Sequence, residues 1–340
     1  MKTILRHECA NVIVEELAPG KNIINVKLLN NDLYIPDDTC ETSYPIDLIN
    51  KILDVKGPAW LCDEILRDES PDLVQRCLKY DLLSYVEEAE FNNKRLLDFG
   101  CGSGASTMVL ARMFPYTEIV GVELEKKFLS IAKSRSDHYG YKNVQLIISP
   151  GPNELPPDLG YFDYVVLSAV YEHLLPDERT ILLRKIWDVI KPGGILFINQ
   201  TPNKYFPIEI HSTSGLPLIN YLPDNVSLFY ARHFSRRNLK ECSWEDLLRQ
   251  GIRGGSVEEI LNIIDSSPQK PILLHPYRLG MEDRIDLFYK DSYIRLDATR
   301  FIIIKKIFLL SMKFLKSLTG IFILPFLSLA IKKESSLSLR

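Results

Sequence analysis

The sequence lacks the features of a secreted protein, of a disulfide-rich protein and of a protein stabilised by structural zinc. Its six cysteines, spread over 340 residues, form no C-x-x-C pair and show no zinc-type spacing. Charged residues near the N-terminus precede any apolar stretch of signal-peptide length. The longest uncharged run, residues 317–331, is shorter than the roughly 20 apolar residues of a membrane-spanning helix, and it contains a glycine and a proline. We therefore expect a cytoplasmic protein without a membrane span.

The net charge is also small, at −3 from 41 basic and 44 acidic residues. Seven basic residues and one acid lie after residue 300, so the rest of the chain is acidic. An acidic domain without an N-P-P-Y-type motif is not expected to bind nucleic acid. Only the C-terminal tail has the charge to favour an anionic partner.

The order of apolar runs predicts an α/β fold. Residues 1–93 begin with β-branched segments and end in helical spacing, which indicates an N-terminal cap. Across residues 94–201, short apolar runs alternate with segments of helical period, the pattern of βαβ units. We expect a Rossmann-like, doubly wound, mostly parallel sheet that binds ligands beyond the carboxyl ends of its strands. The expected core strands are 94–100, 118–124, 143–149, 162–170 and 194–201.

Two additions follow this core. Residues 202–300 begin rich in proline and aromatic side chains, and we expect an acceptor-binding insertion and the last strands of the sheet there. Residues 301–340 form a basic tail in which an apolar C-terminal helix is expected over 301–331. Four lysines of this helix fall within roughly one quadrant of its circumference, as expected for a helix at an anionic membrane surface: Lys305, Lys306, Lys313 and Lys316. The alternative is a helix packed on the domain or on a second subunit.

Three alternating glycines, Gly100, Gly102 and Gly104, directly follow the first core strand. They permit a tight turn, a close backbone approach to a ligand and free N–H groups at the start of the next helix. Asp98 precedes the loop, and Glu123 follows it at the spacing where an acid accepts hydrogen bonds from ribose hydroxyls. The loop also satisfies the loose dinucleotide form G-x-G-x-x-G/A, so an NAD-dependent oxidoreductase is an alternative.

Four elements together resemble the class I S-adenosylmethionine-dependent methyltransferases. They are the acidic glycine loop, the acid Glu123, F-D at 162–163 and K-P-G-G at 191–194. The resemblance covers residues 94–201 and implies S-adenosylmethionine as the cofactor. It implies that the glycines face the methionine and ribose, that Asp98 holds the amino group directly or through water, that Glu123 holds the ribose diol and that Leu124 lies beside the adenine. The implied cofactor-binding set is Asp98, Gly100, Cys101, Gly102, Gly104, Glu123 and Leu124.

The segment after the fourth core strand suggests how the acceptor is activated. Y-E-H at 171–173 resembles the L-E-H of quinone-biosynthesis O-methyltransferases, so we predict Glu172 and His173 as catalytic residues, with His173 as a base. His211, in the insertion, is a further catalytic candidate. We expect no metal site, because Ala169 stands where some relatives have a glutamate that completes one.

The insertion carries P-N-x-x-F-P-x-E-x-H at 202–211, followed by G-L-P at 215–217. This segment resembles methyltransferases of bacterial surface-polysaccharide and glycolipid pathways. The predicted function is therefore methylation, on oxygen, of a small-molecule, glycan or lipid-linked acceptor. The tail would bring the enzyme to the inner face of the membrane through 301–331. A catalytically silent protein that binds the cofactor, or a scaffold, is the other alternative.

Overall fold

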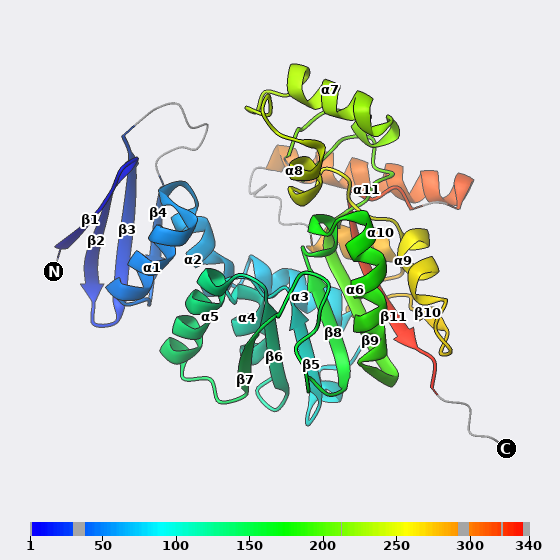
Figure 1. Ribbon diagram of the computed structural model, residues 1–340, viewed down its shortest axis with the longest axis horizontal. Helices are drawn as coiled ribbons and strands as arrows, with labels where there is room; N and C mark the ends of the chain where they lie inside the picture. The colour runs from blue at the N-terminus through cyan, green and yellow to red at the C-terminus, as the bar shows by residue number, and fades with distance from the viewer. Residues whose placement is uncertain (1, 30–37, 212, 292–298, 321, 336–340) are drawn as a thin grey trace.

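The computed structural model describes residues 2–29, 38–211, 213–291, 299–320 and 322–335 (Figure 1). The N-terminal part forms a four-stranded antiparallel sheet in the order β1-β2-β3-β4. Alternate residues of β2 are buried, so one face of this sheet is apolar and packs against the helix that follows it. The elements are β1 (Lys2–His7), β2 (Ala10–Ala18), β3 (Lys21–Leu28), β4 (Asp38–Thr42), α1 (Ile46–Lys56), α2 (Leu61–Glu69) and α3 (Val74–Leu83).

The second sheet has seven strands in the order β10-β11-β9-β8-β5-β6-β7. Strands β9, β8, β5, β6 and β7 pair in parallel, and β11 and β10 extend the sheet antiparallel at one edge. The predicted Rossmann-like, mostly parallel α/β fold is therefore confirmed. The core elements are β5 (Arg95–Phe99), α4 (Ala105–Met113), β6 (Glu118–Glu123), α5 (Lys126–Tyr139), β7 (Val144–Ile148), β8 (Phe162–Ser168), α6 (Pro176–Asp188) and β9 (Ile190–Pro202).

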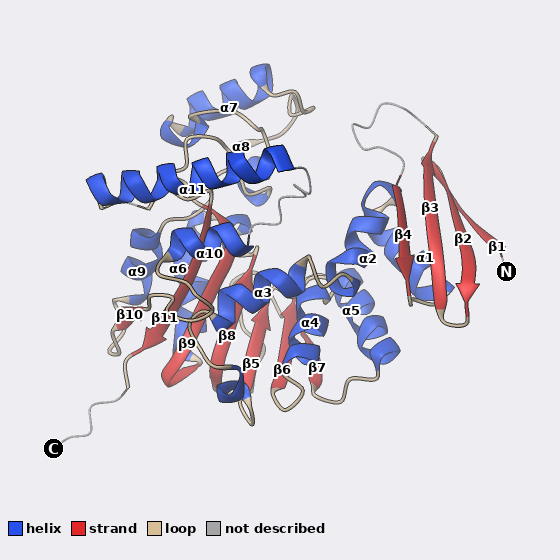
Figure 2. Ribbon diagram, turned by 180° about the vertical axis from the view of Figure 1, so that it is seen from behind, coloured by secondary structure: helices blue, strands red, loops and turns tan. Residues whose placement is uncertain are grey.

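Helices cover both faces of this sheet (Figure 2). One apolar core packs α6 and α9 (Val257–Ile264) against the sheet and contains the fully buried Trp187. The core on the other face contains side chains of α3, α4 and α10 (Arg284–Asp291). Because both faces are covered, the parallel strands consist of nearly continuous apolar residues rather than alternating ones.

The insertion after β9 forms a separate layer beside the core. Helices α7 (Asp224–Phe234) and α8 (Trp244–Arg249) share a small apolar cluster that includes Leu216, Ile219 and Leu247. Figure 1 shows this layer above the sheet, on the side of α6 and β9. Its position allows the insertion to contribute side chains at the carboxyl ends of the core strands.

The tail differs from the expectation of one helix over 301–331. Helix α11 (Thr299–Thr319) ends before Gly320, whose φ of +71° takes the chain out of the helix. Strand β11 (Phe326–Lys333) then pairs with β9 and with β10 (Pro271–Leu273). The prediction is wrong for 326–331 because these apolar residues are needed in the sheet, where Leu329 and Ile331 are buried. Likewise, β10 is the only one of the last strands among the described residues of 202–300, and β11 lies in the tail.

Candidate functional site

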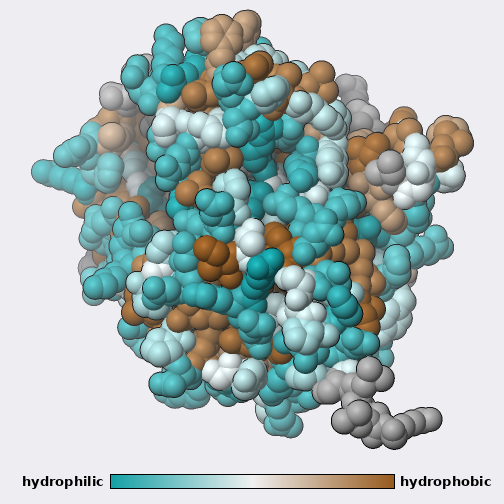
Figure 3. Space-filling view, turned by 45° about the vertical axis from the view of Figure 1, so that its right-hand side comes forward, coloured by the Kyte–Doolittle hydropathy of each residue, from teal (hydrophilic) through white to brown (hydrophobic). Residues whose placement is uncertain are grey.

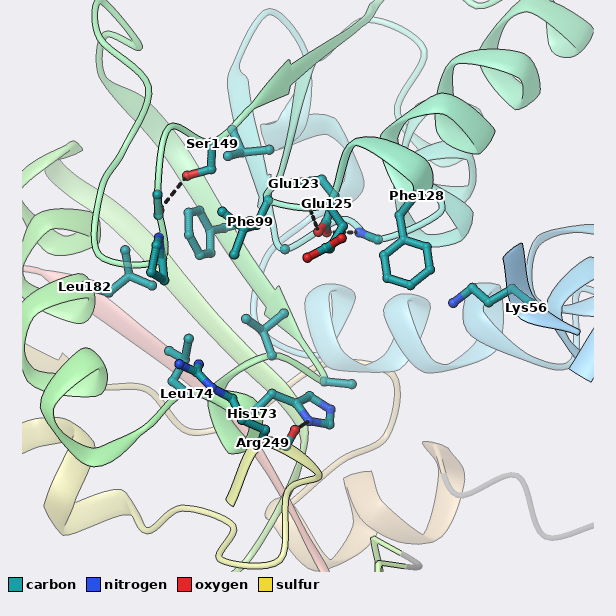
Figure 4. Close-up of a pocket in the computed structure, with 18 residues that line it drawn as sticks. Lys56, Phe99, Glu123, Glu125, Phe128, Ser149, His173, Leu174, Leu182 and Arg249 are labelled. Carbon is teal, nitrogen blue, oxygen red and sulfur yellow. Dashed lines mark hydrogen bonds between the residues drawn. The ribbon is translucent and has the colours of Figure 1, made fainter. Parts of the chain in front are cut away.

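A cavity of about 540 Å³ opens at the carboxyl ends of β5, β6 and β8 (Figure 4). Pockets for ligands of cofactor size occupy about 300–1,000 Å³. Glu123 and Phe128 lie on one side of it, and His173 and Arg249 lie on the other. Its described lining residues are Lys56, Phe99, Gly100, Gly102, Val122, Glu123, Leu124, Glu125, Phe128, Ser149, Gly151, Pro152, Ala169, Val170, His173, Leu174, Leu182 and Arg249.

The three positions of the loop need glycine for different structural reasons. All three have positive φ, which glycine adopts without strain. A Cβ on Gly100 would lie 2.7 Å from the side chain of Val170, and a Cβ on Gly104 would lie 2.9 Å from the Cα of Ala132. Gly102 has open space around it and lines the cavity. Gly100 and Gly102 therefore shape the pocket, while Gly104 lets α4 approach α5.

Glu123 joins the loop to the pocket. Its Oε2 accepts a hydrogen bond from the Gly102 N–H at 2.8 Å, and its Oε1 accepts one from the Glu125 N–H at 2.9 Å. Each carboxylate oxygen has a second lone pair, and Glu123 lines the cavity. The carboxylate can therefore accept further bonds from a ribose diol without losing its backbone partners. Leu124, 43% exposed, lies beside it in the lining.

Asp98 lies beneath the loop rather than in the cavity. It is 1% exposed, and its Oδ2 accepts hydrogen bonds from Ser106 at 2.8 Å and Thr107 at 2.6 Å. This arrangement does not offer the direct cofactor contact that the resemblance implies, because the carboxylate points to the first turn of α4. A contact through water stays a prediction. Cys101 is buried, and neither it nor Gly104 lines the pocket.

The burial of Asp98 gives the protein a specific pH dependence. Burial raises the pKa of Asp98 from 3.8 to about 6. The folded state therefore favours the protonated carboxyl: its contribution to stability is full below about pH 4 and is lost as the pH rises through 6. The free energy of unfolding lost by neutral pH is about 3 kcal/mol.

We expect Asp98→Asn to remove about 2 kcal/mol of the change in unfolding free energy between about pH 4.5 and pH 7, measured by urea unfolding. Identical pH dependence in both proteins would contradict this assignment.

Some pocket residues have no simple signal in the sequence. Lys56, at the end of α1, lies with its Nζ 4.3 Å from the centre of the Phe128 ring. It comes from the N-terminal part of the chain, so only the tertiary fold brings it to the cavity. Ser149 donates a hydrogen bond to the Gly151 carbonyl and so shapes the loop after β7. Phe128 could have been found from its place just after Glu123, at the start of the following helix.

The three predicted catalytic residues come together. His173 and His211 each direct Nε2 toward the same oxygen, Glu172 Oε1, at 3.9 and 3.6 Å. The two imidazole rings are 4.9 Å apart. Glu172 and His173 follow β8 in a short 3-10 turn, while His211 comes from the insertion. His173 lines the cavity, so the cluster borders the pocket.

Burial controls the protonation of this cluster. It raises the pKa of Glu172 to about 7 and lowers the pKa values of both histidines below their usual range. The histidines are therefore mostly neutral at neutral pH. His173 Nδ1 is 2.7 Å from the Arg249 carbonyl oxygen, so the ring proton lies on Nδ1 and donates to that oxygen. The lone pair of Nε2 is then free on the side of Glu172.

A family model described as a methyltransferase domain matches residues 97–196. This range contains the glycine loop, Glu123 and the Glu172–His173 pair. The chain belongs to the class I S-adenosylmethionine-dependent methyltransferases. Family membership decides between the two cofactors that the glycine loop permits, in favour of S-adenosylmethionine over NAD. We predict that this cofactor binds in the cavity between Glu123 and His173.

Relatives of this methyltransferase have different names. The uncharacterized protein RP028 of Rickettsia prowazekii is 30% identical over 200 residues, 59% of this chain and 70% of that protein. Malonyl-[acyl-carrier protein] O-methyltransferase of Halalkalibacterium halodurans is 30% identical over 149 residues, covering 42% and 53% of the two chains. Carboxy-S-adenosyl-L-methionine synthase of Pectobacterium atrosepticum is 25% identical over 152 residues, covering 42% and 61%. The match to the two named enzymes thus spans little more than half of their length.

Proposed function

We propose that this methyltransferase methylates an oxygen of a small-molecule, glycan or lipid-linked acceptor. The observation that carries the proposal is the cluster of Glu172, His173 and His211 at the border of the cofactor cavity. Methyl transfer from a sulfonium is an in-line displacement, and a hydroxyl acceptor must lose its proton to complete it. A buried cluster of two neutral imidazoles and a carboxylate supplies the groups that remove this proton.

The insertion supports an acceptor with ring surfaces. Tyr205, Tyr221 and Phe229 are each about half exposed in this layer and can stack on a sugar or quinone ring. Arginines of the insertion could instead hold a phosphate or carboxylate, but two of them are engaged within the protein. Arg249 forms two 2.5 Å hydrogen bonds to Glu178, and Arg253 donates to three backbone carbonyl groups. Arg249 and Arg253 are therefore not free to bind an anion, and the exposed aromatic side chains are the acceptor contacts that we propose for this layer.

We expect His173→Ala to lower the methylation rate by about 100-fold or more, the usual size of a lost proton-transfer group. The measurement is transfer of labelled methyl from S-adenosylmethionine to separate lipid, glycan and quinone extracts of the host. The affinity for S-adenosylhomocysteine should change by less than about threefold, since His173 is only one of the many residues that line the pocket. His275→Ala, which removes an exposed histidine after β10, is the control and should keep full activity. Full activity of His173→Ala would exclude this role for the cluster.

We also propose that α11 brings the enzyme to a membrane surface. Among the residues that the structure describes, no helix is long and apolar enough to cross a membrane. The helix does present an outward apolar stripe, and Figure 3 shows apolar side chains gathered at the upper right of that view. The stripe residues, each more than half exposed, are Ile303, Ile307, Leu310, Phe314 and Leu318. This pattern suits insertion into the interfacial region of a bilayer.

Two of the four lysines expected to face lipid form ion pairs within the protein instead. Lys313 is 2.6 Å from Asp286, and Lys316 is 2.6 Å from Asp283, so they hold α11 against α10. The apolar stripe rather than a basic one therefore carries the proposal. We expect Ile307→Asp with Phe314→Asp to reduce sedimentation with anionic phospholipid vesicles at least fivefold, because each charge opposes insertion. The control, Ile181→Asp, adds a charge at a partly exposed position on α6 and should leave vesicle binding unchanged. Absence of vesicle binding by the unaltered protein would remove the proposal.

A further inference from the structure

The three side chains beside the cofactor cavity have the geometry of a metal site. The donor atoms of Glu172, His173 and His211 all lie within 4.8 Å of one another. Donor atoms around a tetrahedral ion with bonds of about 2.0–2.1 Å are about 3.4 Å apart. The two Glu–His separations, 3.6 and 3.9 Å, exceed this value by only a few tenths of an ångström. Both imidazoles are thus close to the spacing at which each shares an ion with Glu172, and the two histidine donor atoms lie within 4.8 Å of each other.

The buried carboxylate lacks a partner at the point where the donors converge. Glu172 has no exposed surface, and its Oε2 accepts a hydrogen bond from Thr201 at 2.9 Å. Its Oε1 has no hydrogen-bond partner among the described residues. Within the described chain, the only basic side chains within ion-pair distance of this carboxylate are the two histidines. A buried unpaired carboxylate oxygen is costly, and a cation between it and the two imidazoles would satisfy it.

The surrounding contacts orient one imidazole as a metal ligand requires. Metal-binding histidines commonly donate their other ring N–H to a carbonyl or carboxylate, which fixes the ring and its tautomer. His173 makes this bond to the Arg249 carbonyl, and the two bonds from the Arg249 guanidinium to Glu178 hold that residue in place. The His211 ring packs on Gly251, where an added Cβ would lie 2.8 Å from Nδ1. Both rings are thus held with Nε2 toward Glu172.

We propose that Glu172, His173 and His211 bind a divalent transition-metal ion such as Zn²⁺ or Co²⁺ beside the cofactor cavity. Two imidazoles and one carboxylate match the donor preference of these ions, and three protein ligands leave a fourth position for a substrate oxygen. This revises the expectation of no metal site, which rested on Ala169. His211, from a distant segment, supplies the third donor that position 169 lacks.

The metal site deepens the proposed function and rests on it for its chemical use. An acceptor hydroxyl that occupies the fourth position loses its proton to solvent more readily, because the cation stabilises the oxyanion. This oxygen then attacks the methyl carbon. The O–C bond forms, the C–S bond breaks, and its electron pair goes to sulfur, giving the methyl ether and S-adenosylhomocysteine. With the ion bound, the imidazoles hold the ion and the proton goes to solvent, whereas in the metal-free protein the same imidazoles accept the proton as proposed above.

Titration of the metal-free full-length protein with Co²⁺ tests the site directly. We expect one equivalent to bind, with visible absorption bands of a four- or five-coordinate ion, and Zn²⁺ to displace it. His211→Gln and Glu172→Gln should each weaken Co²⁺ binding at least tenfold. His233→Ala is the matched control and should bind as the unaltered protein does. Circular dichroism verifies that each variant is folded, and His173→Gln replaces any that is not.

The possible results separate the metal site from the methyl transfer. Stoichiometric Co²⁺ binding that depends on these residues supports the site, whether or not an oxygen acceptor is found. Absence of binding to the unaltered protein, or equal binding by the cluster variants and His233→Ala, overturns it. Transfer of labelled methyl to an oxygen in metal-free buffer would then leave the proposed function intact.

Discussion

Gly104→Ala is expected to lower the free energy of unfolding by about 2–5 kcal/mol. Gly104 caps the N-terminus of α4 with a φ of +88°, a region that costs an L-residue about 1–2 kcal/mol. The added Cβ would also lie 2.7 Å from the Cβ and 2.9 Å from the Cα of Ala132, so α5 must move. Overpacking of this kind costs about 1–3 kcal/mol more. Urea unfolding of the full-length chain measures the sum.

Gly140→Ala separates the two causes of that loss. Gly140 has a φ of +69° but nothing within 4 Å of an added Cβ. It should therefore show only the backbone cost, about 1–2 kcal/mol. If the two substitutions destabilise the protein equally, the close approach of α4 and α5 at Gly104 contributes nothing.

Glu123→Ala should weaken the binding of S-adenosylhomocysteine by about 100-fold or more. Hydrogen bonds to a charged group contribute about 1.5–3 kcal/mol each, and the carboxylate faces the cavity with lone pairs for both ribose hydroxyls. The substitution also removes the acceptor of the Gly102 N–H, which holds the glycine loop against the end of β6. Isothermal titration calorimetry gives the affinity.

Glu125→Ala is the control for this measurement. Glu125 also lines the cavity, and the bond that joins it to Glu123 comes from its backbone N–H, which the substitution keeps. Its affinity should remain within about threefold of the unaltered protein, the range of a rim contact. An equal loss in both variants would indicate a general charge effect and would contradict the ribose assignment.

The glycine loop and the parallel sheet were predictable because each depends on local sequence. Buried parallel strands need continuous apolar runs, and a ligand-binding turn needs glycine at fixed positions. The position of Asp98 was not predictable in the same way. Its carboxylate can turn toward the ligand or toward Ser106 and Thr107, and the choice depends on side-chain geometry in three dimensions.

The hydrogen bonds by which the N-terminal part holds the glycine loop could not be predicted from the sequence either. Glu64 of α2 accepts hydrogen bonds from the Ser103 hydroxyl and from Arg135 of α5, and Arg135 donates to the Ser103 carbonyl. These residues lie up to 71 positions apart, and nothing in their spacing marks them as partners. The same holds for His211, which only the folded insertion brings to Glu172. Strand β11 was mistaken for helix because an apolar run of its length suits either structure.

A crystal structure of the full-length protein with S-adenosylhomocysteine tests the central claim most directly. We predict the ribose hydroxyls within hydrogen-bond distance of Glu123, the adenine beside Leu124, and the sulfur directed toward His173. The methyl donor and the Glu172–His173–His211 cluster would then share one reaction space. A nucleoside bound elsewhere, or a sulfur directed away from His173, would contradict the account.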